Sequence, residues 1–95
     1  MSASILVVED EEPIQILLSY NLEAEGYRVR ATRQGEDVAR LAGEERPDLI
    51  LLDWMLPGIS GIEVCRLLRV RPETRDIPVI MLTARSEEAE RVRGL

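Results

Sequence analysis

The pattern of apolar and polar residues along the chain predicts four strands. The continuous apolar runs that begin at residues 5 and 49 predict strands over 5–8 and 49–53, and a third run predicts a strand over 78–83. Such runs are typical of strands covered on both faces, as in a parallel sheet. Residues 27–31 instead alternate apolar and polar side chains. This pattern predicts a half-exposed strand at an edge of the sheet.

Between the predicted strands 5–8 and 27–31, the apolar residues change to helical spacing. Pro13 suits the first turn of a helix, and the apolar positions that follow are Ile14, Leu17, Leu18 and Leu22. Gly26 is expected to end this helix. A second, short helix is predicted over residues 35–42, and Pro57-Gly58 predicts a turn.

Two further helices are predicted from their starting signals. Ser60 and Glu63 fit a capping box, in which the hydroxyl and the carboxylate each accept a bond from the other residue's amide. The apolar residues of the helix that follows are Val64, Cys65, Leu67 and Leu68. Ser86 is expected to cap a last helix, with Glu87 and Glu88 in its first turn, where the helix dipole favours anions.

The alternation of strands and helices predicts an α/β fold with right-handed parallel crossovers. The half-exposed strand belongs at an edge beside the first strand, which gives the strand order 2-1-3-4. This is a doubly wound, flavodoxin-like sheet. Its winding reverses between the first and third strands, and ligands bind such sheets at that point, outside the carboxyl ends of the strands.

Acidic residues follow the two strands that flank this point. The first strand runs into residues 9–12, all acidic, and the third ends on Asp53. Because parallel strands end on one edge of the sheet, Glu9, Asp10 and Asp53 are expected to share a crevice. Crowded carboxylates repel one another unless a cation lies between them, and hard oxygen ligands suit Mg²⁺.

Composition excludes several other kinds of chemistry. The chain has no His, and its twelve basic residues are all Arg. This rules out a catalytic His, a Schiff-base Lys and a P-loop Lys within these residues. The net charge of −6 disfavours binding to nucleic acid or to an anionic membrane. Cys65 is the one cysteine, no apolar run approaches 18 residues, and a signal peptide is not evident, so we expect a cytoplasmic protein.

The chain resembles the response-regulator receiver domains of two-component systems. The segments that carry this resemblance are residues 5–11, residues 47–53, Pro57-Gly58 with Gly61, and the strand end at residues 82–84. Residues 53–57, 74–78 and 91–95 are closer still to receivers that control phosphate-starvation genes. The resemblance covers residues 1–95, and implies one CheY-like receiver domain without its fifth strand and fifth helix.

The resemblance implies roles for the acidic residues. Asp53 would be the phosphoacceptor, a nucleophile that forms an acyl phosphate. Mg²⁺ would be bound by Asp10, Asp53 and the backbone carbonyl of Met55, with Glu9 acting through a water. The phosphodonor would be a sensor histidine kinase. The domain would promote only its own phosphorylation and dephosphorylation, and a DNA-binding domain outside this chain would act on the genes.

The resemblance also implies a switch and a dimer surface. Thr83 would turn toward the phosphoryl group beside the small residue Ala84, and Arg91 and Arg93 would lie on the surface used for dimerisation. Receivers carry a Lys after the fifth strand that pairs with the phosphoryl group, and this sequence has no Lys. We therefore expect little or no stable phosphorylation of these 95 residues alone.

Simpler interpretations remain open for single residues. The acidic residues 9–12 also suit a solvated helix N-terminus, and Asp53 also suits a turn cap. Thr83 also fits an ordinary strand end, and Arg91 with Arg93 a solvated helix face. Trp54 fits equally a reporter of the site and a packed loop residue. Cys65 is expected to belong to the core.

Three other functions compete with the signalling switch. A metal-dependent phosphohydrolase commonly has a second Asp two residues after its nucleophile, where this chain has Met55. A flavodoxin-like cofactor module would need a phosphate loop after the first strand, where this chain is acidic. A pseudo-receiver, which binds partners without phosphorylation, remains the alternative because Lys is missing.

The fourth predicted strand has no later strand to pair with in this chain. Its apolar run is typical of a strand with neighbours on both sides, and an unpaired apolar edge favours association with a second copy. We therefore expect self-association through this edge, with segment exchange as one form of it.

Overall fold

The computed structural model describes residues 2–82, which form one parallel sheet with helices on both faces. The strands are β1 (Ser4–Val8), β2 (Arg28–Thr32), β3 (Leu49–Asp53) and β4 (Val79–Leu82). Their order is β2-β1-β3-β4, and every neighbouring pair is parallel. The predicted fold class and strand order are therefore confirmed. Thr83, Ala84, Arg91, Arg93 and the predicted helix over 86–95 lie outside the described residues.

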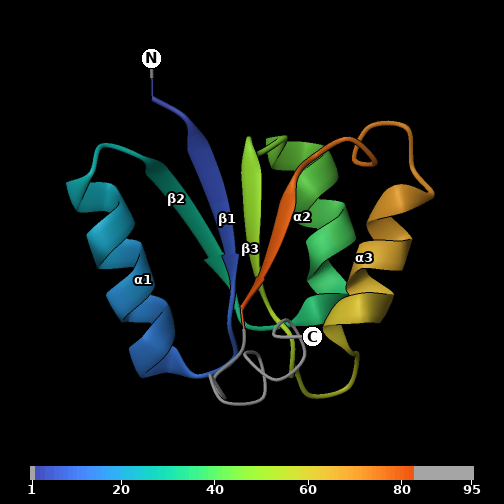
Figure 1. Cartoon of the computed structure of the whole chain (residues 1–95), viewed down its shortest axis with the longest axis horizontal. Helices are drawn as coiled ribbons and strands as arrows, with labels where there is room; N and C mark the ends of the chain where they lie inside the picture. The colour runs from blue at the N-terminus through green and yellow to red at the C-terminus, as the bar shows by residue number, and fades with distance from the viewer. Residues whose placement is uncertain (1, 83–95) are drawn as a thin grey trace, which may run out of the picture.

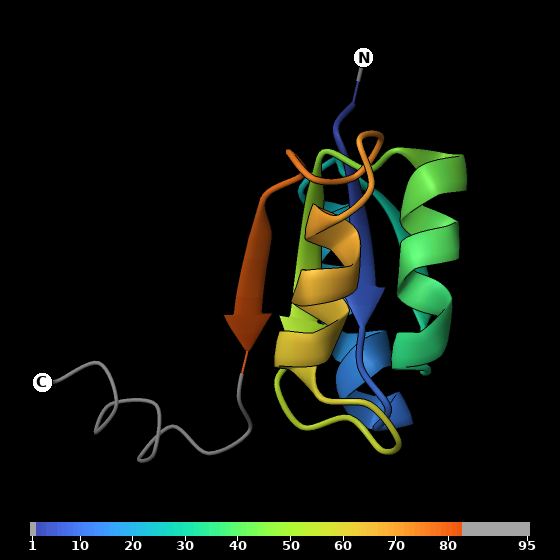
Figure 2. The same cartoon turned by 90° about the vertical axis from the view of Figure 1, so that its right-hand side faces the viewer.

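Helices cover the two faces of the sheet unequally. Helix α1 (Glu12–Ala24) lies alone on one face, whereas α2 (Val38–Glu45) and α3 (Gly61–Arg69) lie together on the other (Figures 1 and 2). A short 3-10 turn, η1 (Gly35–Asp37), leads into α2, so the predicted helix over 35–42 begins as a tighter turn and continues to Glu45.

The core lies between the sheet and the pair α2 and α3. Alternate residues of β1 and β3 point to this face and are fully buried, as the two-residue repeat of a strand requires: Leu6, Val8, Ile50 and Leu52. They pack with Val38, Leu41, Val64 and Leu68 of the two helices. Cys65 packs against this cluster half-buried, which confirms the expectation that it belongs to the core.

Helix α1 covers its face only in part. It contacts β1 and β2, but none of its residues is fully buried, and its outer apolar side chains Ile16, Leu17 and Tyr20 are exposed. Ile80 of β4 is also 49% exposed. Strand β4 is thus less covered than its apolar run alone would suggest.

Local signals end α1 and begin α3. Pro13 lies in the first turn of α1, and Gly26 follows that helix with φ of +98°, a conformation that glycine adopts without strain. At α3 the Ser60 hydroxyl accepts a bond from the Glu63 amide at 3.1 Å. The other half of the predicted capping box is wrong, because the Glu63 carboxylate accepts from the Arg66 guanidinium instead, at 2.7 Å.

Candidate metal and phosphoacceptor site

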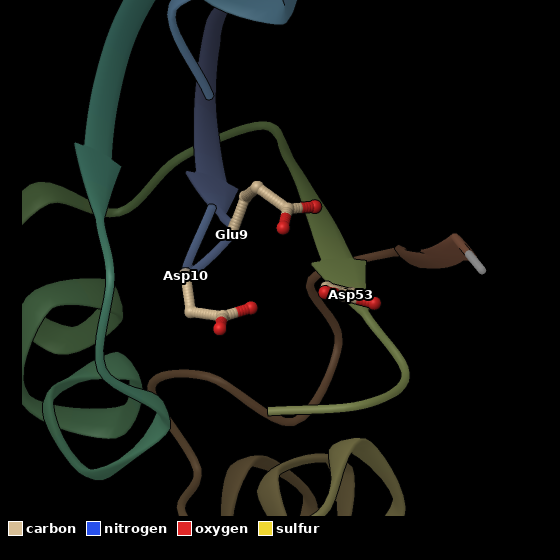
Figure 3. A group of neighbouring side chains, drawn as sticks. All are labelled: Glu9, Asp10 and Asp53. Atoms are coloured by element: carbon tan, nitrogen blue, oxygen red, sulfur yellow. The ribbon is translucent and has the colours of Figure 1, made fainter. Parts of the chain in front are cut away.

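Three carboxylates converge at the carboxyl ends of β1 and β3. Glu9 and Asp10 follow β1, and Asp53 is the last residue of β3, the neighbouring strand (Figure 3). Each offers an oxygen within 4.8 Å of the others. The parallel register places Val8 beside Leu52, so the residues that follow them meet at one sheet edge. The predicted grouping of these side chains is therefore confirmed.

Asp53 is held firmly in this cluster. It is only 6% exposed, and its Oδ1 accepts a bond from the Met55 amide at 3.1 Å. The Trp54 amide donates to the Leu82 carbonyl at 2.7 Å, which continues the pairing of β3 with β4 just beyond Asp53. Asp53 therefore caps the following turn, as one interpretation predicted, and also faces the other carboxylates.

Gly61 allows α3 to pack directly behind this loop. Its amide donates to the Trp54 carbonyl at 3.0 Å. A Cβ at this position would lie 3.1 Å from the Trp54 Cα and 3.2 Å from the Asp53 carbonyl oxygen. A larger residue at position 61 would therefore push the backbone that carries Asp53.

The Glu9 carboxyl has a raised pKa. It is 5% exposed, and burial is the largest influence that raises its pKa, to about 7 from the ordinary 4.5. A bond from the Glu11 amide to the Glu9 carboxylate lowers the pKa, and the nearby charges of Asp53 and Asp10 raise it. The surroundings of Glu9 thus disfavour the charged form of its carboxyl in the metal-free protein.

An open groove adjoins the cluster. It has a volume of about 590 Å³ and is lined by Asp10 and the loop between β3 and α3, including Trp54, Met55 and Pro57. Trp54 is 40% exposed in this lining, so it lies at the rim of the site and is not packed in the core. Asp10 is the one member of the carboxylate cluster that lines this groove.

The donor set fits a small hard cation. All three groups are carboxylates, and within residues 2–82 they are the one group of three or more metal-ligating side chains that lie close together. Two opposite ligands of Mg²⁺ are about 4.2 Å apart. The three oxygens lie within 4.8 Å of one another, slightly more than that span, so a side-chain movement or a bridging water would complete the coordination. Carboxylates and waters together can therefore surround such an ion.

Sequence and structure comparisons identify the domain. The family model for the response regulator receiver domain matches residues 5–95. The chain belongs to this family. Over all 95 residues it is 60% identical to the phosphate regulon transcriptional regulatory protein PhoB of Rhizobium meliloti and 50% identical to PhoB of Escherichia coli. The chain spans 42% of the length of each of these relatives.

Solved receiver domains share the fold. The N-terminal domain of a response regulator receiver protein from Methanoculleus marisnigri is 37% identical, with a TM-score of 0.84 over 97% of this chain and 76% of that one. The receiver domain of the sensor histidine kinase PA1611 from Pseudomonas aeruginosa is 34% identical, with a TM-score of 0.86 over 97% of this chain and 75% of that one. That structure has a magnesium ion in its active-site cleft.

The predicted receiver identity and its likeness to phosphate regulators are thus confirmed. None of the helices in residues 2–82 is long and apolar enough to cross a membrane. Two residues near the site carry no signal in the sequence, namely Gln15 and Arg33, whose side chains donate to the backbone carbonyls of Glu9 and Asp10. No motif marks such bonds, because their partners are backbone atoms.

Proposed function

We propose that this receiver domain accepts a phosphoryl group on Asp53 from the phosphohistidine of a sensor histidine kinase. The convergence of Glu9, Asp10 and Asp53 at the switch point of the sheet carries this proposal. A buried carboxylate beside two other acids suits a nucleophile whose reaction builds up negative charge next to a bound cation.

Asp53 would act as the nucleophile. The Met55 amide holds Oδ1, so the other carboxylate oxygen remains for attack on phosphorus. The new O–P bond forms as the P–N bond to the donor imidazole breaks, and the freed imidazole nitrogen keeps the bonding electron pair. The product is an acyl phosphate on Asp53. A carboxylate needs no general base for this attack, which agrees with a chain that has no His.

Mg²⁺ is the proposed cofactor. Asp10, Asp53 and the Met55 backbone carbonyl would hold it, with Glu9 acting through a water. When bound, Mg²⁺ would supply neutralisation of the charge that develops on the phosphoryl oxygens. Around it, Asp53 presents the attacking oxygen and Asp10 borders the groove through which the donor enters. The domain would thereby promote its own phosphorylation and dephosphorylation and no other reaction.

The role of the whole protein is inferred from its curated relatives. The curated relatives are phosphate regulon transcriptional regulators. We infer that the whole protein switches transcription of phosphate-starvation genes through a DNA-binding domain outside this chain, and that Thr83, Ala84, Arg91 and Arg93 serve the switch and the dimer surface. The receiver itself would bind no nucleic acid and no membrane, and the whole protein would act in the cytoplasm.

Because the sequence has no Lys, one alternative function remains. Within this sequence no Lys can pair with the phosphoryl group. A pseudo-receiver that binds partners without phosphorylation would bind Mg²⁺ or a partner normally, yet would stay unlabelled even when the chain continues through a fifth strand that supplies Lys.

Small phosphodonors test the proposal. We expect acetyl phosphate with Mg²⁺ to add one acid-labile phosphoryl group to a chain extended through the fifth strand, and little or none to the 95 residues alone. Mass spectrometry would show the added phosphate, and Asp53→Ala should abolish it. Labelling that persists in Asp53→Ala would assign the role to another carboxylate, and no labelling of the extended chain would favour the pseudo-receiver.

A further inference from the structure

Two side chains from separate elements bond to successive carbonyls at the end of β1. Gln15 of α1 donates from Nε2 to the Glu9 carbonyl at 3.0 Å. Arg33, in the loop between β2 and η1, donates from Nε to the Asp10 carbonyl at 3.1 Å. The Glu9 amide is also fixed, because it donates to the Thr32 carbonyl at 3.1 Å.

These bonds act on the direction of the Asp10 side chain. The carbonyls of Glu9 and Asp10 belong to the peptide planes on either side of the Asp10 Cα. Because each plane is rigid, fixing both of them fixes the φ and ψ of Asp10 and therefore the direction of its Cα–Cβ bond. Glu9 and Asp53 are buried and are held by packing, whereas Asp10 is only half-buried. Asp10 is the member of the cluster that most needs such support.

The bonds also affect which oxygens of the loop face a cation. The Glu9 and Asp10 carbonyls are directed toward Gln15 and Arg33, whereas the carboxylates of the two residues converge with Asp53. Without the two donors, repulsion among the three carboxylates would favour rotation of the Asp10 peptide planes and separation of the charges.

We propose that Gln15 and Arg33 are positioning residues of the cation site, which orient Asp10 through the backbone without touching the ion. This inference rests on the proposed function, since it assumes that the cluster binds Mg²⁺. Positioning and charge predict opposite changes in Mg²⁺ affinity when Arg33 is replaced. Arg33 is a cation, so an effect through charge alone would oppose Mg²⁺, and its removal would tighten binding. Positioning requires the opposite result, and requires it of the neutral Gln15 as well.

Mg²⁺ titration of single variants, followed by Trp54 fluorescence or calorimetry, tests the inference. Gln15→Met and Arg33→Met remove the donors but keep most of the side-chain volume. We expect each to weaken Mg²⁺ binding about three- to tenfold, as for the loss of one hydrogen bond that orients a ligand. Arg28→Met is the matched control, because Arg28 pairs with Ser4 at the opposite end of the same strands. It should leave Mg²⁺ affinity nearly unchanged.

The thermal midpoint of the metal-free protein separates positioning from general support of the fold. Weaker Mg²⁺ binding by both folded variants, measured well below their midpoints, supports positioning. Lower midpoints with unchanged Mg²⁺ affinity would overturn it, as would tighter binding by Arg33→Met. Failure of the unsubstituted protein to bind Mg²⁺ would overturn the proposed site and this inference together, whereas equal binding by all variants would overturn this inference alone.

Discussion

At the scale of single residues, the site is a compromise between burial and charge. Glu9 and Asp53 are almost fully buried next to each other, although neither has a basic side chain as an ion-pair partner among the described residues. Backbone amides of Glu11 and Met55 supply hydrogen bonds but no full positive charge. The metal-free cluster therefore opposes folding at neutral pH, and a bound cation would relieve that cost.

Glu9→Gln should stabilise the metal-free protein at pH 8. The pKa of Glu9 is raised in the folded protein, to about 7 from 4.5. Its contribution to stability is therefore fully present below about pH 4.5 and is lost as pH rises through 7. The amide avoids this loss, so we expect a gain of up to about 3 kcal/mol at pH 8 and almost none near pH 4.

Chemical unfolding in the presence of EDTA at the two pH values measures this difference. Glu12→Gln is the control, because Glu12 is exposed in the first turn of α1. If Glu9→Gln raises the free energy of unfolding equally at both pH values, the raised pKa of Glu9 is not the cause of the gain. Saturating Mg²⁺ should reduce the advantage of Glu9→Gln, since the cation stabilises the charged cluster of the unsubstituted protein.

At the scale of elements, α3 supports the site through its first turn. Its first turn lies directly behind the Asp53 loop through Gly61, and its last turn joins β4 through a loop held by side chains. Arg69 donates to the Arg75 and Ile77 carbonyls at 2.8 and 3.2 Å. Helix α3 therefore links the loop after Asp53 to the opposite end of the sheet, where β4 begins.

Ser60→Ala should destabilise the protein by about 1 kcal/mol, because the Ser60 hydroxyl caps the Glu63 amide. Glu63→Ala should cost less, since the Glu63 carboxylate makes an exposed pair with Arg66 and does not complete a capping box. Urea unfolding of the two variants compares these costs. An equal or larger loss in Glu63→Ala would indicate that the reciprocal cap forms in solution.

Thr74→Val should be costlier, at about 1–3 kcal/mol. Thr74 is fully buried, and its hydroxyl donates to the Leu68 carbonyl at 2.7 Å near the end of α3. Valine keeps the shape but leaves that carbonyl without its donor. Thr74→Ser, which keeps the hydroxyl, is the matched control for urea unfolding. If serine costs more than valine, the methyl group and not the hydrogen bond is the stabilising feature.

At the scale of the whole molecule, residues 2–82 leave β4 at the edge of the sheet. It pairs with β3 on one side, and Ile80 is 49% exposed. An apolar edge strand with free backbone groups can pair with a second copy. The negative net charge of −6 opposes association over long range but is screened by salt.

We expect the 95-residue protein to self-associate, and to do so more strongly in salt. Light scattering across concentration would detect it, and hydrogen exchange would show slower exchange of the β4 amides in the associated form. Ile80→Lys should reduce association, whereas Ile62→Lys, on α3 and similarly exposed, should not. A monomer at high concentration with strongly protected β4 amides would contradict this prediction.

The sequence by itself determined the sheet and the position of the site. Apolar runs predict the strands of a parallel sheet, and parallel strands bring their carboxyl ends to one edge, where Glu9, Asp10 and Asp53 meet. Only the tertiary structure decided that Gln15 and Arg33 hold the backbone of the acidic loop, and that Thr74 supports the end of α3. Hydrophobic periodicity is repeated along the chain and can be read from it. A single hydrogen bond between a side chain and a distant carbonyl depends on the paths of two loops, which no local pattern encodes.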